Sequence, residues 1–200
     1  MQLVIDSATA ACSAALIGAH GRVIAERHEV VGRGHAERLV PMIAELLDGR
    51  RPDAILVDCG PGSFTGVRVG LAAAHGLAIG WQVPVRGYSS LALVAAAAGA
   101  PALAVAMLGG HGELFVQSYE GDPLAPADEL RSLTPEAAAA LVEAELVVGS
   151  GAGALVAARG HGRAVDALPR ASDAVRLPDT LRNLPPRPIY GRAPDAKPMT

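Results

Sequence analysis

The sequence contains very few cysteines, aromatic residues and lysines, and each shortage excludes a class of protein. Its 200 residues include two cysteines, too few for a disulfide scaffold or a zinc cluster. Aromatic residues make up 3% of the chain, which leaves little for a surface that stacks single-stranded RNA bases. The only lysine is Lys197, so the body of the fold has none for a Schiff base or a P-loop.

Charge is also sparse. The chain has 17 basic and 20 acidic residues, a net charge of −3, and this balance predicts no extended nucleic-acid surface. No signal peptide is recognisable in the first residues. The uncharged run at residues 91–110 is broken at residues 99–101 by glycine and proline, which favours a helix and a strand over a membrane span. We therefore expect a soluble, cytoplasmic protein.

The apolar patterns predict two similar α/β halves with mixed sheets. The first half has the order β-β-β-α-β-α-β-α, and a looser version of that order comes after it. We expect an N-terminal domain at residues 1–100 and a smaller C-terminal domain at residues 101–200, with an irregular, proline-rich tail. The expected strands are residues 3–6, 12–17, 23–28, 55–57, 83–86, 102–107, 114–119 and 146–148, and the expected helices are residues 36–47, 67–79, 91–98, 135–143 and 154–158.

The most informative motif is GPGSFTGVRVG at residues 60–70, which comes after a predicted strand and opens a predicted helix. Free amides at the start of that helix could receive a phosphate or a carboxylate. An equally supported alternative is a tight turn whose glycines allow close helix packing. Asp6 ends the first predicted strand. A carboxyl group in such a turn is more often held by backbone amides than used to hold a phosphate. The phosphate hypothesis assigns a site to Asp6, Ser7, Gly60, Gly62, Ser63 and Thr65.

Neither the histidines nor the helices point to a metal enzyme. No two of the six histidines lie three or four residues apart, and Leu39 stands where a His-x-x-x-His pair starting at His35 would need its second ligand. The helix at residues 67–79 is rich in glycine and alanine and has few polar groups. Such a helix suits packing on a sheet, a helix-on-helix subunit interface, or both on different faces.

Six ordered motifs are spread along nearly the whole chain: residues 3–13 (LVIDSATAACS), 35–41 (HAERLVP), 60–70, 88–91 (YSSL), 148–152 (VGSGA) and 188–192 (PIYGR). Together they resemble the TsaB family. The resemblance implies an actin-like, sugar-kinase-like fold of two α/β domains. It also implies a non-catalytic subunit that dimerises with the catalytic subunit TsaD. The complex forms N6-threonylcarbamoyladenosine in tRNAs that read codons beginning with A.

The same resemblance implies the other partners. TsaD carries the metal and the substrate site, a small ATPase called TsaE is the third component, and tRNA is reached through the complex. The chain would need no cofactor of its own, although ATP or ADP could bind at the complex interface, and without TsaD it could form a homodimer. One departure from the family is the loss of Asp-Ala-Arg before Glu113, where residues 108–112 read LGGHG.

The predicted partner surface lies on two helices, at residues 36–47 and 67–79, that would bundle with the corresponding helices of TsaD. Two alternatives remain open: an independent nucleotide-binding ATPase of the actin-like fold, and a metallopeptidase homologue. The ATPase alternative lacks support from a lysine or a clear second phosphate loop. The residues assigned to the partner surface are Glu37, Leu39, Val40, Ile43, Leu47, Arg68, Val69, Ala72, Ala73 and Gly76.

Overall fold

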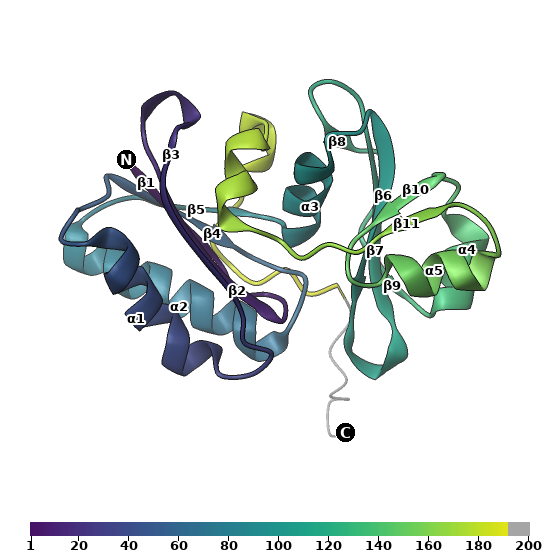
Figure 1. Cartoon of the computed structure of the whole chain (residues 1–200), viewed down its shortest axis with the longest axis horizontal. Helices are drawn as coiled ribbons and strands as arrows, with labels where there is room; N and C mark the ends of the chain where they lie inside the picture. The colour runs from purple at the N-terminus through teal and green to yellow at the C-terminus, as the bar shows by residue number, and fades with distance from the viewer. Residues whose placement is uncertain (192–200) are drawn as a thin grey trace, which may run out of the picture.

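The computed structural model describes residues 1–191, so Arg192 of the last motif and Lys197 lie outside the described residues. Two sheets form the framework, and each carries a pair of helices on its outer side (Figure 1). A further helix, at residues 90–98, and a 3-10 turn, at residues 171–176, lie between the two sheets. Within the described part of the chain, no helix is both long and apolar enough to cross a membrane.

The first sheet has the strand order β3-β2-β1-β4-β5. β1 pairs antiparallel with β2, and β2 pairs antiparallel with β3, because short turns join them. β4 and β5 run parallel to β1, because helices provide the crossovers. The elements are β1 (Gln2–Asp6), β2 (Ala11–Ile17), β3 (Val23–Val30), α1 (His35–Leu47), β4 (Ala54–Asp58), α2 (Phe64–Trp81), β5 (Val85–Tyr88) and α3 (Ser90–Ala98).

The second sheet repeats this arrangement, with the order β11-β10-β6-β7-β8 and β9 also paired to β7. β6 and β7 are antiparallel, whereas β10 is parallel to β6 and β11 is parallel to β10. The repeated order confirms the predicted duplication and the mixed-sheet, actin-like fold class. The elements are β6 (Ala102–Leu108), β7 (Leu114–Glu120), β8 (Ala125–Pro126), β9 (Arg131–Leu133), α4 (Pro135–Leu141), β10 (Leu146–Val148), α5 (Ala152–Arg159) and β11 (Arg163–Val165).

Three short strands and one helix boundary differ from the sequence-based expectation. β8, β9 and β11 have two or three residues each, too few to give a periodic signal. α2 begins at Phe64 and not at Val67, because the Ser63 hydroxyl caps the helix by accepting from the Gly66 amide. The other predicted helices and strands are present, with ends shifted by a few residues.

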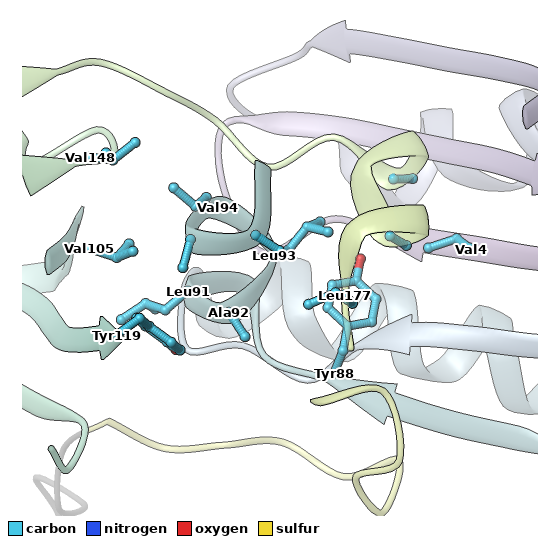
Figure 2. Packing of buried hydrophobic residues seen from close by; sticks show 14 of the residues in the cluster. Val4, Tyr88, Leu91, Ala92, Leu93, Val94, Val105, Tyr119, Val148 and Leu177 are labelled. Carbon is cyan, nitrogen blue, oxygen red and sulfur yellow. The ribbon is translucent and has the colours of Figure 1, made fainter. Parts of the chain in front are cut away.

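The largest core cluster lies between the two sheets and is centred on α3 (Figure 2). Nearly every residue of α3 is buried, which explains its uninterrupted alanine and leucine composition. Tyr88 and Val4 approach this helix from the first sheet, and Val105 and Tyr119 approach it from the second. A separate cluster fills the space between the first sheet and α1 and α2.

The chain returns to the first sheet after completing the second. Two 3-10 turns, η3 (Ala171–Arg176) and η4 (Asp179–Leu181), come after β11. Leu184 then exchanges two backbone hydrogen bonds with Gly87, with N···O distances of 2.7 and 3.0 Å. Residues of the predicted second domain thus pack on the first sheet, and they extend its β5 edge.

Candidate functional site

The glycine-rich loop after β4 packs directly on the turn after β1. The Ser63 amide donates to the Ala8 carbonyl at 2.6 Å, and the Ser7 hydroxyl donates to the Gly66 carbonyl at 2.9 Å. A β-carbon at Gly62 would overlap the Ala8 carbonyl oxygen, and one at Gly66 would overlap that of Ser7. The glycines are therefore required for close approach, in agreement with the packing interpretation of the motif.

The six residues of the phosphate hypothesis do not converge on one surface. Asp6, Ser7 and Gly60 are buried, whereas Thr65 is exposed. Ser63 already caps its own helix, so the Gly66 amide, one of those that would receive a phosphate, is already bonded to its hydroxyl. The sequence alone left both interpretations open, because the hydroxyl at a helix N-cap and the hydroxyl of an anion site have the same sequence signal.

Two buried carboxyl groups lie beneath this loop, at the ends of β1 and β4. Asp6 accepts from the Tyr88 hydroxyl at 2.9 Å, and Asp58 accepts from the Gly60 amide at 2.9 Å. Burial raises the pKa of Asp6 to about 6, against a smaller opposing effect of the Tyr88 hydrogen bond. Burial, with the nearby Asp6 as a second cause, raises the pKa of Asp58 well above its ordinary value.

A cavity of about 930 Å³ opens between the ends of the two sheets. Its volume is in the range of small-molecule sites. One wall is the turn after β1 with the start of α2, and the other is the β6–β7 turn. The lining residues include Thr9, Ser63, Phe64, Arg68, Gly110, His111, Phe115, Ser132 and Tyr190.

Arg68 is fixed at the edge of this cleft and is not free to extend from α2. Its guanidinium carbon lies 3.3 Å from the centroid of the Phe64 ring, and one of its nitrogens donates to the Tyr190 hydroxyl at 2.6 Å. This contact joins the start of α2 to the last described residues of the chain. Phe64, 69% exposed, and Tyr190, 59% exposed, leave apolar surface open beside it.

The structure corrects the predicted partner surface. Leu39, Ile43 and Leu47 are buried in the core between α1 and the first sheet, so they are not available to a partner. The same helical spacing that identified them as apolar is the spacing that turns them inward. Of the others, Val69 and Ala73 are half-buried, and the exposed ones are Glu37, Val40, Ala72 and Gly76.

An exposed row of small residues runs along α2, at the spacing of one helical turn. Ala72, Gly76 and Gly80 are exposed, and Ile79 beside them is 80% exposed. A β-carbon at Gly76 or Gly80 would meet nothing within 4 Å, so these glycines are not required for packing within the chain. Sequence reasoning missed Gly80 and Ile79, although their i+4 and i+3 relation to Gly76 places them on its face.

Comparisons with known proteins place the chain within one family. Residues 22–166 match the family model TsaD, tRNA N6-adenosine threonylcarbamoyltransferase. The Escherichia coli tRNA threonylcarbamoyladenosine biosynthesis protein TsaB is 38% identical over 129 residues, 60% of this chain and 55% of that protein. An uncharacterized Mycobacterium tuberculosis protein is 34% identical over 98% of this chain and 94% of its own length. Solved YeaZ from Pseudomonas aeruginosa has a TM-score of 0.79 at 32% identity, covering 94% of this chain and 98% of that one.

Proposed function

The chain belongs to the TsaB family of tRNA threonylcarbamoyladenosine biosynthesis proteins, and from this premise we propose that it is the non-catalytic partner of a TsaD-like transferase. It would dimerise with that subunit and support formation of N6-threonylcarbamoyladenosine in tRNA. A TsaE-like ATPase would join the same complex, and tRNA would be bound through the complex. Alone, the chain would use the same surface for a homodimer.

The exposed row on α2 is the observation that carries this proposal. A glycine inside a helix costs about 1 kcal/mol relative to alanine. Gly76 and Gly80 are open to solvent and have no neighbour that requires them. Small side chains let a second helix approach closely, so the cost is offset when a partner helix packs there. Ile79 and, on α1, Val40 would add apolar area to that contact.

The non-catalytic role is supported by the state of the glycine-rich loop. The Ser63 hydroxyl of this loop accepts a hydrogen bond from the Gly66 amide. Asp6 and Ser7 are buried beneath the loop and do not line the cleft. The cavity between the sheets supports the alternative, an independent nucleotide-binding ATPase, because its volume of about 930 Å³ would accept a nucleotide. Calorimetry with Mg-ATP and an ATP-turnover assay on the isolated chain separate the two, and turnover would favour the ATPase.

A glycine-to-alanine substitution tests the partner surface because the two expected effects have opposite signs. Gly76→Ala should stabilise the isolated chain by up to about 1 kcal/mol, since the helix gains propensity and the new methyl meets nothing. The same methyl should weaken the complex with the organism's own TsaD homologue about tenfold, by holding the helices apart. Denaturant unfolding and light-scattering titration measure the two effects.

Gly153→Ala is the matched control, because Gly153 is also an exposed helical glycine with nothing near its β-carbon, but it lies in α5. It should leave the complex unchanged. Two glutamate variants extend the test. Ala72→Glu on α2 should abolish the complex, whereas Ala154→Glu on α5 should preserve it. Full binding and tRNA modification by folded Ala72→Glu would contradict the proposed surface.

A further inference from the structure

Asp6 and Asp58 are neighbours by the register of the first sheet. Each is the last residue of its strand, and β1 and β4 run parallel with Ile5 opposite Val57. The next position on both strands is therefore a carboxyl group. Asp6 is completely buried, and Asp58 is 2% exposed.

Each carboxyl group has one satisfied oxygen and one that is not. Oδ2 of Asp6 accepts from the Tyr88 hydroxyl, and Oδ1 of Asp58 accepts from the Gly60 amide. The remaining oxygens, Oδ1 of Asp6 and Oδ2 of Asp58, are buried and have no hydrogen-bond partner among the described residues. Hydrogen-bonding contributions from the Ala8 backbone to Asp6, and from the Ser90 side chain and backbone to Asp58, lower the two pKa values but do not outweigh burial.

Among the described residues, none places a positive charge beside the two carboxyl groups. Three other titratable groups interact electrostatically with Asp6 or Asp58: Tyr88 on β5, Cys59 after β4 and Cys12 on β2. Burial raises the pKa of all three. Within residues 1–191, no basic side chain is among the causes that set the pKa of either aspartate. Two adjacent buried carboxylates without a cation are strongly unfavourable, whereas one proton removes one of the charges.

We propose that Asp6 and Asp58 share a single proton, held between Asp6 Oδ1 and Asp58 Oδ2, so that the pair carries one negative charge in the folded protein. The proton satisfies both unpartnered oxygens at once. It links the ends of β1 and β4, from which the Ser7–Ala8 turn and the glycine-rich loop both begin. The pair therefore anchors the base of α2 independently of any partner.

The proposal fixes the direction of a pH effect. Aspartates in the unfolded chain have a pKa of about 4, and the folded pair keeps its proton to higher pH. The stabilising contribution is fully present below the unfolded pKa, and it declines as pH rises from about 4 until the pair loses its proton. Over the part of that window in which the folded pair holds one proton and the unfolded chain holds none, the unfolding equilibrium constant increases about tenfold for each pH unit, relative to a chain without the shared proton.

Asp58→Asn imitates the protonated state and tests the proposal. Its amide oxygen can still accept from Gly60, and its amide nitrogen can donate to Asp6 Oδ1. As the pH rises from 5 to 8, the unfolding equilibrium constant of wild type should increase at least tenfold relative to that of Asp58→Asn. Asp166→Asn, at an exposed position, is the control and should show a constant ratio to wild type. Denaturant unfolding at several pH values measures all three proteins.

Infrared spectroscopy provides a second readout that does not depend on stability. The carbonyl-stretch band of a protonated carboxyl group should appear at neutral pH in wild type minus Asp58→Asn difference spectra. If Asp58→Asn does not fold, Asp6→Asn replaces it in both measurements. A stability ratio that stays flat with pH, or a wild-type spectrum at neutral pH without that band, overturns the proposal.

Discussion

The two sheets contain equivalent glycine-rich loops, one at residues 60–63 after β4 and one at residues 149–151 after β10. In both, a loop amide donates to a carbonyl at or beyond the first strand of the same sheet: Ser63 to Ala8, and Gly151 to Ala106. A β-carbon at Gly149, which has a φ of 121°, would overlap the same Ala106 carbonyl oxygen. The duplicated fold thus brings each loop against its first strand.

This likeness shows what the glycines do. They occur in both loops because a parallel strand-to-helix connection here passes within contact of a neighbouring backbone, so glycine content alone does not indicate a phosphate site. The two loops differ in the helix that each one opens. α2 has 18 residues with an exposed row of small side chains, whereas α5 has eight. Only the first loop therefore positions a helix long enough for an extended helix-on-helix contact.

The largest expected effect is at Gly66, in the first turn of α2. Gly66→Ala should destabilise the chain by about 3 kcal/mol or more, because the new β-carbon meets the rigid backbone carbonyl of Ser7. Urea unfolding monitored by circular dichroism measures the loss. A loss below about 1 kcal/mol would mean that the loop can move off the β1 turn, and that its glycines serve another purpose.

The corresponding test in the second sheet should be milder. Gly151→Ala places a β-carbon 2.7 Å from Cδ2 of Leu114, the far end of a flexible side chain that can rotate away. We expect a loss of about 1–2 kcal/mol, measured in the same unfolding assay. A loss as large as that of Gly66→Ala would show that the two loops are equally constrained, and would contradict a tighter junction in the first sheet.

The smallest effects are expected at Ser7 and Ser150, which each form one hydrogen bond between a loop region and its sheet. Ser7 donates to the Gly66 carbonyl in a buried position, so Ser7→Ala should cost about 1–2 kcal/mol. Ser150 accepts from the Leu108 amide where water can replace it, so Ser150→Ala should cost about 0.5 kcal/mol. Reversal of this order in unfolding experiments would contradict the assignment of the tighter junction to the first sheet.

The order of strands and helices can be predicted well from the sequence, because turns and changes of period are local signals. The prediction is wrong on the buried stripe of α1, since the spacing of Leu39 and Ile43 defines a core face and not a partner surface. The cleft could not be predicted either. Phe115 and Tyr190 reach the same cavity from distant segments, and no local pattern records that convergence.

The Asp6–Asp58 pair lies outside the sequence prediction for a similar reason. Asp6 stands out as the acid that ends the first strand, but Asp58 carries no signal of its own. Their juxtaposition depends on the parallel register between β1 and β4, which the sequence does not specify directly. Tertiary pairing, more than residue type, creates the two unpartnered oxygens.

The return of the chain to the first sheet has a consequence for the order of folding during synthesis. Leu184 and Ile189 make their backbone hydrogen bonds to Gly87 and Cys59 only after every strand of the second sheet has been translated. The first half would therefore leave the ribosome with its β5 edge and its α3 face uncovered. We expect a chain truncated before residue 171 to aggregate during synthesis, since its final contacts are long-range and arrive last.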